Sequence, residues 1–217
     1  IYVDVTFGGG GHARSIFEQM EHGTLIAFDQ DPDASRNTTS FESDAQRSFI
    51  FVPSNFRHLK RYLKFHKIDK VDGILADLGV SSHQFDQQSR GFSTRFDGAL
   101  DMRMDKGSAI TAAKVVNEYS EVDLIQLLSR YGEIRNAKKL AAEITSARAI
   151  APIYTTAALG SIAVKSAPNG KHAKYLAQLF QAIRIEVNDE ISALKEFLTQ
   201  SKDVLKVGGR LVIISYH

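Results

Sequence analysis

The sequence predicts an α/β fold in which helices cover both faces of a parallel sheet, with a mainly helical segment inserted after the fourth strand. Three observations lead to this prediction. Apolar runs alternate with helix-competent stretches along the first 77 residues. These runs are almost continuously apolar, which is typical of strands buried on both faces. After residue 84 helical periodicity replaces the alternation, until a last apolar run closes the chain.

The first half of the chain supplies four strands and the helices between them. Strands are predicted at Ile1–Val5, Thr24–Phe28, Ser48–Val52 and Val71–Ala76. Helices are expected at His12–Glu21, from Pro32 onward and at Phe56–Lys67. Pro32 suits the first turn of a helix because no intrahelical N–H bond is needed there.

The second half reads as helices and loops until the final strand. Residues 85–110 are loop-like, 114–150 carry helical periodicity, and 151–177 form a short helix with loops. Helix resumes near 176 and continues with a break to 204, and a fifth strand follows at Arg210–Ser215. We therefore expect a core of residues 1–84 and 176–217, and a helical insertion of residues 85–175.

Composition excludes several classes of protein. The chain has 217 residues, of which 43% are hydrophobic and 24% charged, as in a folded globular protein. The absence of cysteine excludes disulfides, thiolate catalysis and Cys-ligated zinc. A net charge of +2 is compatible with a nucleic-acid partner without requiring one. We expect no membrane span and no signal peptide, and we expect the natural protein to continue at both ends.

Glycines and strand-end acids point to an adenine-nucleoside cofactor. Gly8–Gly11 separate the first strand from a helix, where backbone N–H groups can approach a ligand. Asp29 ends the second strand, where its carboxylate can accept hydrogen bonds from both ribose hydroxyls. Nicotinamide and S-adenosylmethionine enzymes share these features. The glycines match the dinucleotide spacing only partially, and Asp77 ends the fourth strand, so a methyltransferase is favoured. An oxidoreductase and a noncatalytic RNA-binding protein remain alternatives.

Longer motifs resemble one family along the whole chain. They are Asp4–His12, Asp77–Asp86, Arg90–Ser93, Asp97–Asp105, Tyr131–Glu133, Phe180–Glu190 and Gly208–His217. In these segments the chain resembles the bacterial small-subunit ribosomal RNA (cytidine-N4) methyltransferases, the RsmH (MraW) family. It departs from the family pattern at Ala99, at Ile134 and over His172–Ala177.

The resemblance implies a cofactor, a reaction and a partner. S-adenosylmethionine would bind a Rossmann-like core, and the implied substrate is a cytidine in the decoding region of 16S ribosomal RNA. The small ribosomal subunit is then the partner, in the cytoplasm, with no role for DNA or a membrane; a homodimer is left open. The implied cofactor residues are Gly10, Gly11 and His12 at the methionine end, Asp29 at the ribose, Phe56 at the adenine, and Asp77 and Gln84.

The reacting amine and the RNA need residues of their own. The Asp77 carboxylate, or backbone carbonyls beside it, is the candidate acceptor of the amine hydrogen bond, with cofactor orientation by Asp77 as an equal alternative. The expected RNA contacts are Ser81, Arg90, Phe92, Ser93, Arg95, Asp101, Arg103 and His217, with Phe92 stacking on the base. The basic run from Arg57 to Lys67 is interpreted as a solvated helix face. His58, His66 and His172 lack metal-ligand spacing, so no metal is expected.

Overall fold

The computed structural model describes the backbone of residues 1–215 and the side chains of these residues outside 82–83. It divides into two compact units. The first comprises Ile1–Ser81 and Ile191–His217, and the second comprises Ser82–Glu190. Within the described residues, no helix combines the length and the apolar character needed to cross a membrane.

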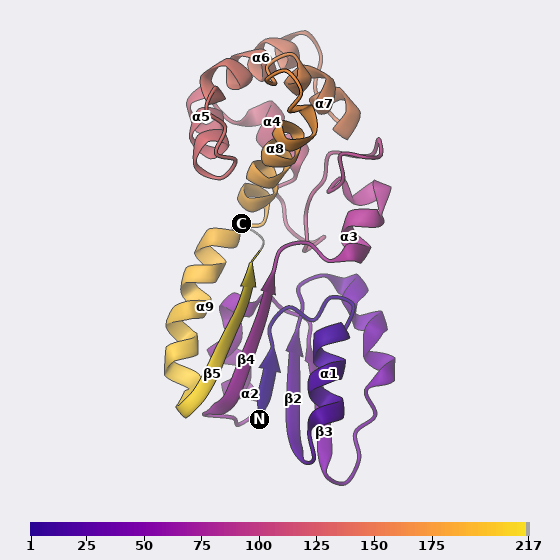
Figure 1. Ribbon diagram of the computed structural model, residues 1–217, viewed down its shortest axis with the longest axis vertical. Helices are drawn as coiled ribbons and strands as arrows, with labels where there is room; N and C mark the ends of the chain where they lie inside the picture. The colour runs from indigo at the N-terminus through magenta and orange to yellow at the C-terminus, as the bar shows by residue number, and fades with distance from the viewer. Residues whose placement is uncertain (216–217) are drawn as a thin grey trace. The chain divides into compact units, whose positions relative to one another are not determined.

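The first unit is built on a five-stranded parallel sheet with the order β3-β2-β1-β4-β5 (Figure 1). The strands are β1 (Tyr2–Asp4), β2 (Gly23–Phe28), β3 (Arg47–Val52), β4 (Val71–Leu78) and β5 (Leu205–Ser215). All five predicted strands are confirmed. The β5 strand begins earlier than predicted, because a register shift against β4 takes up the residues around Gly208, whose φ is 80°.

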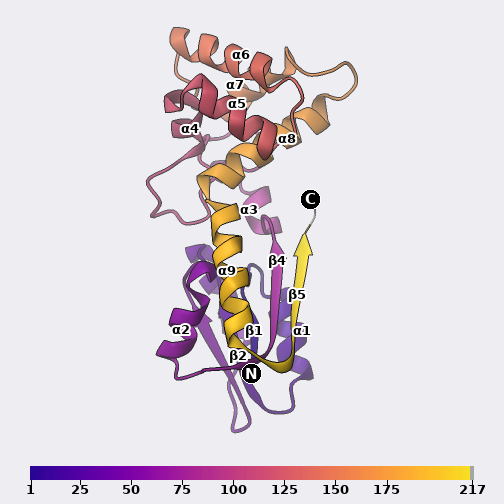
Figure 2. The ribbon, with the colours of Figure 1, turned by 90° about the vertical axis from the view of Figure 1, so that its left-hand side faces the viewer.

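Helices cover both faces of this sheet, as predicted (Figure 2). The side chains of β2, which point alternately to the two faces of the sheet, show why both faces are covered. Leu25 and Ala27 join the cluster formed with α1 (Gly11–Gln19), whereas Ile26 and Phe28 join the cluster formed with α2 (Leu59–Phe65) and α9 (Glu190–Val204). Successive side chains of a strand point to opposite faces, so both faces of β2 must be apolar.

Two short 3-10 helices complete the first unit. The first, η1, spans Pro32–Ser40, and Asp31 caps it by accepting a hydrogen bond from the Asp33 N–H at 3.0 Å. The predicted helix start at Pro32 is therefore confirmed. The second, η2, spans Phe56–His58 and leads directly into α2.

The second unit is helical, as predicted. It contains α3 (Ser82–Asp86), η3 (Gln88–Arg90), α4 (Ala112–Glu118), α5 (Glu121–Arg130), α6 (Ala137–Ile150), α7 (Thr156–Val164) and α8 (His172–Val187). Side-chain oxygens of Thr111, Ser120 and Thr155 cap α4, α5 and α7. Such caps satisfy N–H groups that have no intrahelical partner.

The compact units place the end of the insertion later than residue 175. Helix α8 is continuous from His172, and its Tyr175 hydroxyl donates to Asn136 Oδ1 at 2.9 Å. Near its end, Tyr119 donates to Glu186 Oε1 at 3.0 Å. Helix α8 ends at Val187 with Asn188 as its C-cap, and the φ of 47° at Asp189 then turns the chain away from the helical path. The predicted boundary therefore falls inside a helix of the second unit.

Candidate functional site

The loop between β1 and α1 is shaped by glycine. Gly8 has a φ of 49° and Gly10 a φ of 78°, in the left-handed region that other residues rarely adopt. Gly10 is the N-cap of α1, and no side chain that the structure describes caps that end of the helix. The first N–H groups of a helix lack intrahelical partners. The start of α1 therefore offers backbone donors to a ligand at the carboxyl edge of the sheet, as the glycines predict.

Asp29 follows β2 and holds this loop. Its Oδ2 accepts a hydrogen bond from the Gly8 N–H at 2.7 Å, and its Oδ1 accepts one from the Asp31 N–H at 2.8 Å. Burial raises the pKa of the Asp29 carboxyl. Each carboxylate oxygen has a further lone pair, so Asp29 can order the loop and still accept a hydrogen bond from a ribose hydroxyl.

Asp4 is an acid at this edge to which sequence reasoning assigned no role. It ends β1 and is 0% exposed, and burial raises its pKa to about 6. Its Oδ1 accepts a hydrogen bond from the Thr6 N–H at 3.0 Å, whereas its Oδ2 has no partner among the residues that the structure describes. A buried acceptor without a partner is costly, which suggests a ligand. The available signal was an acid closing an apolar run just before the glycines.

Strand β4 brings Asp77 to the same edge. The Asp77 N–H donates to Thr6 Oγ1 at 2.7 Å, so Thr6 links the ends of β1 and β4. Oδ2 of Asp77 lies 3.4 Å from Nε2 of His12. The His12 side chain is 52% exposed and that of Asp77 28%, so both can meet a ligand. The structure thus pairs a predicted cofactor residue with the predicted catalytic acid.

Phe56 lies beyond the end of β3, next to the Asn55 N-cap of η2. Its ring packs edge-on against Phe197, with the ring centroids 5.4 Å apart, and it remains partly exposed. The Asn55 amide donates to Gln30 Oε1 at 2.7 Å and so ties the segments after β2 and β3 together. A half-exposed aromatic ring at this position can pack against an adenine.

The remaining predicted site residues differ in exposure. Ser81 is half-buried at the end of the first unit, and Gln84 is buried in the second. Arg90, Phe92 and Ser93 are only 3–6% exposed. The Arg90 guanidinium donates to the carbonyl oxygens of Arg103 and Met104 at 2.9 and 3.2 Å. Phe92 is 6% exposed, and the predicted stacking of a base on its ring stays a prediction.

The side chains of Asp101 and Arg103 also stabilise the loop that contains them. Arg103 donates to both Asp101 oxygens at 2.8 Å, and it donates to the carbonyl oxygens of Lys106 and Ser108. Arg95, by contrast, is exposed. The predicted contact at His217 lies outside the described residues.

The basic run along η2 and α2 is partly engaged by α9. Arg57 pairs with Glu196 and Lys60 with Asp203, each with a nitrogen–oxygen distance of 2.8 Å. These side chains join two helices of one face of the first unit. Among the residues that the structure describes, no group of three or more His, Asp or Glu side chains could hold a metal ion.

A parallel sheet with a glycine loop after its first strand, and acids at the carboxyl ends of its first, second and fourth strands, defines a Rossmann-like α/β core. Comparison with known proteins identifies the family. The chain belongs to the MraW methylase family, whose model matches residues 1–217. It is a methyltransferase, and the oxidoreductase and noncatalytic alternatives are set aside.

Curated relatives agree with the family. The ribosomal RNA small subunit methyltransferase H proteins of Cytophaga hutchinsonii and Amoebophilus asiaticus are 54% and 53% identical to the chain over 217 residues. The protein of that name from Flavobacterium johnsoniae is 54% identical over 218 residues. Each alignment covers all of this chain and 72%, 69% and 70% of the respective relative. The resemblance predicted from the motifs is confirmed.

Proposed function

We propose that this protein transfers a methyl group from S-adenosylmethionine to the exocyclic N4 of a cytidine in the decoding region of 16S ribosomal RNA. The proposal is carried by the match of the whole chain to a methylase family, with relatives named for small-subunit ribosomal RNA. The choice of base and atom follows from the family resemblance of the motifs between Asp77 and Asp105.

The carboxyl edge of the sheet fits this cofactor. A Cβ atom added at Gly9 or Gly11 would meet no atom of the described residues within 4 Å, so there is space beside the backbone of the loop. We assign Gly10, Gly11 and His12 to the methionine end of the cofactor. The unpartnered Oδ2 of Asp4 supports a ligand that carries positive charge.

The nucleoside end of the cofactor is assigned to the neighbouring strand ends. Asp29 accepts hydrogen bonds from the ribose hydroxyls, and Phe56 packs against the adenine. Asp77 and Gln84 complete the set of residues that the family resemblance implies. Support comes from the open lone pairs of Asp29 and the partial exposure of Phe56.

The chemistry requires help at the amine. When bound, S-adenosylmethionine supplies an electrophilic methyl group on a sulfonium. The exocyclic amine of cytosine is a poor nucleophile because its lone pair is delocalised into the ring. Asp77 accepts a hydrogen bond from this amine and favours a more tetrahedral nitrogen, while His12 orients the carboxylate from 3.4 Å. Holding the reactants in line contributes ~7–11 kcal/mol in favourable models.

The partner and the compartment follow from this substrate. We expect the protein to act on the small ribosomal subunit in the cytoplasm, with the second unit contributing RNA recognition. The exposed Arg95 of that unit supports such a role, because arginine side chains commonly contact RNA phosphates.

Methyl transfer to small subunits that lack the modification tests the proposal. Labelled S-adenosylmethionine should place label on the N4 of a single cytidine, and label on DNA or protein would contradict the assignment. Asp77→Asn keeps the shape and removes the charge. If Asp77 accepts the amine hydrogen bond, this variant should lose ~10²–10³ in kcat and retain its affinity for the cofactor. Lower affinity with unchanged kcat would assign Asp77 to cofactor orientation instead.

A further inference from the structure

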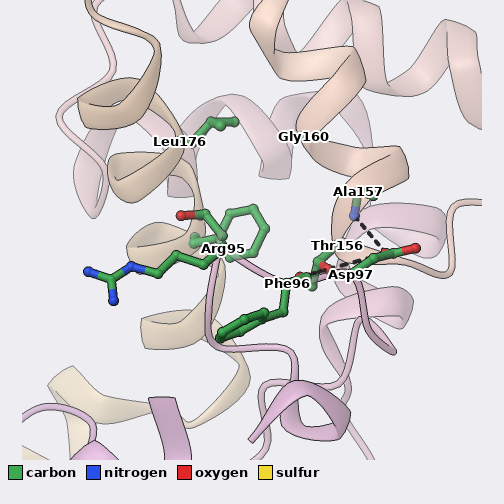
Figure 3. Close-up of a pocket in the computed structure, with 9 residues that line it drawn as sticks. Arg95, Phe96, Asp97, Thr156, Ala157, Gly160 and Leu176 are labelled. Carbon is green, nitrogen blue, oxygen red and sulfur yellow. Dashed lines mark hydrogen bonds between the residues drawn. The ribbon is translucent and has the colours of Figure 1, made fainter. Parts of the chain in front are cut away.

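The second unit contains a small cavity that the cofactor assignment does not use. Its volume is about 170 Å³ (Figure 3). Its lining includes Arg95, Phe96 and Asp97 from one loop, Thr156 from α7, and Leu176 and Phe180 from α8. All of its lining residues belong to the second unit, so the cavity forms within that unit alone.

The loop that lines this cavity is held in place at the start of α7. Thr156 Oγ1 donates to the Phe96 carbonyl oxygen at 2.9 Å and accepts from the Gly98 N–H at 3.0 Å. The Thr156 N–H donates to the Gly98 carbonyl oxygen at 3.0 Å. A Cβ atom at Gly98 would lie 2.1 Å from the Gln88 carbonyl oxygen, so only glycine fits there. The cavity is therefore preorganised by hydrogen bonds between this loop and Thr156.

Three kinds of chemistry meet at the cavity. Phe96 is 42% exposed, so a ligand can reach this aromatic side chain. The exposed Arg95 has its guanidinium carbon 5.7 Å from the centre of the Phe85 ring. In Figure 3 the Arg95 guanidinium extends away from the Phe96 ring, and the Asp97 carboxylate lies at the opposite side, next to the Ala157 N–H.

The first N–H groups of α7 already have hydrogen-bond acceptors, so this helix start is not the anion-binding part of the site. Asp97 Oδ1 accepts from the Ala157 N–H, and Thr155 Oγ1 accepts from the Ala158 N–H, both at 3.1 Å. A negatively charged group at the cavity would instead meet Arg95. Asp97 adds a carboxylate that can accept a hydrogen bond from an exocyclic amine.

This combination matches the way proteins hold unpaired RNA bases. Drug-sized ligands occupy pockets of ~300–1,000 Å³, so the cavity suits a single ring system. Unstacked bases bind aromatic faces and arginine side chains, with hydrogen bonds to their edges. We propose that the cavity binds one unpaired base of the substrate RNA, other than the methylated cytidine. Phe96 stacks on this base and Arg95 contacts its phosphate.

The inference rests on the proposed function, and a set of variants tests it. Affinity for ribosomal RNA containing the decoding region is measured by fluorescence anisotropy. Phe96→Leu keeps an apolar side chain but loses the aromatic face, and should weaken binding by roughly 5- to 150-fold. Phe96→Tyr keeps the face and should bind close to wild type. Arg95→Gln should reduce the salt dependence of log affinity by about 1.

Matched controls separate this site from general effects. Phe65→Leu changes another exposed Phe, 75% exposed on α2 in the first unit, and should leave RNA affinity unchanged. S-adenosylmethionine binding by calorimetry should be equal in all variants. Wild-type RNA affinity in Phe96→Leu would overturn the inference while leaving the proposed function intact. Failure of the wild-type protein to bind or methylate ribosomal RNA would overturn both.

Discussion

At the end of β1, one oxygen of the Asp4 carboxyl accepts a hydrogen bond from the Thr6 N–H, and the other has no partner in the described part of the chain. Burial favours the neutral acid and raises its pKa to about 6. A cationic ligand beside Oδ2 would favour the ionised form. Asp29, at the next strand end, has both oxygens in hydrogen bonds to backbone N–H groups. Two acids that look alike in sequence therefore sit in different electrostatic surroundings.

The titration of Asp4 should change how the free energy of unfolding depends on pH. Its pKa is raised from 3.8 to about 6, so the folded protein binds this proton more tightly than the unfolded chain. The contribution of Asp4 to the free energy of unfolding therefore falls as pH rises from about 4 to about 6. Asp4→Asn removes this loss, which is on the order of 3 kcal/mol. Urea unfolding of both proteins without cofactor, from about pH 4 to about pH 7, measures the difference. Parallel pH profiles would show that Asp4 titrates normally.

At the scale of one element, the loop from Arg90 to Met104 is a packed structure. The Arg90 guanidinium stabilises this loop by donating hydrogen bonds to two of the loop's carbonyl oxygens. Arg103 donates to both carboxylate oxygens of Asp101 and so stabilises the turn between them. Phe92 is 6% exposed, whereas Phe96 in the same loop is 42% exposed. The same loop therefore contains one Phe that stabilises the fold and one that can meet a ligand.

Truncation of Phe92 and of Phe96 to Ala should change the free energy of unfolding by very different amounts. Phe92→Ala empties a buried position and should lower the free energy of unfolding by about 3–5 kcal/mol. Phe96→Ala should change it by less than about 1 kcal/mol. Guanidinium unfolding of the two variants makes the comparison. If Phe92→Ala kept wild-type stability and lost RNA affinity, Phe92 would be the stacking residue that the sequence suggested.

For the whole molecule, the choice between cofactors is the clearest measurement. S-adenosylmethionine or S-adenosylhomocysteine at ~100 times the dissociation constant should add about 2.7 kcal/mol of stability. For a chain of this length that raises Tm by roughly 5–10 °C. NAD should have no effect, and Asp29→Ala should reduce the shift because it removes the ribose acceptor. Stabilisation by NAD alone would contradict the S-adenosylmethionine assignment and support a dinucleotide-binding enzyme.

The sequence by itself determined the positions of the strands along the chain, the glycine loop and the strand-end acids Asp29 and Asp77. These features are local, because an apolar run bounded by turn residues identifies a strand wherever the rest of the chain lies. Parallel strands end at one edge of a sheet, so acids far apart along the chain could be assigned to one site before any coordinates were known.

Only the tertiary structure decided which side chains of the second unit are buried. Arg90 and Phe92 resemble Arg95 and Phe96 in residue type, and composition cannot tell an arginine that binds carbonyl oxygens from one that meets RNA. The cavity beside Phe96 depends on residues of two helices that begin at Thr156 and His172. The unpartnered oxygen of Asp4 likewise depends on which strands and loops surround it. Burial and hydrogen-bond satisfaction arise from long-range packing, and the residue pattern of a single segment does not contain them.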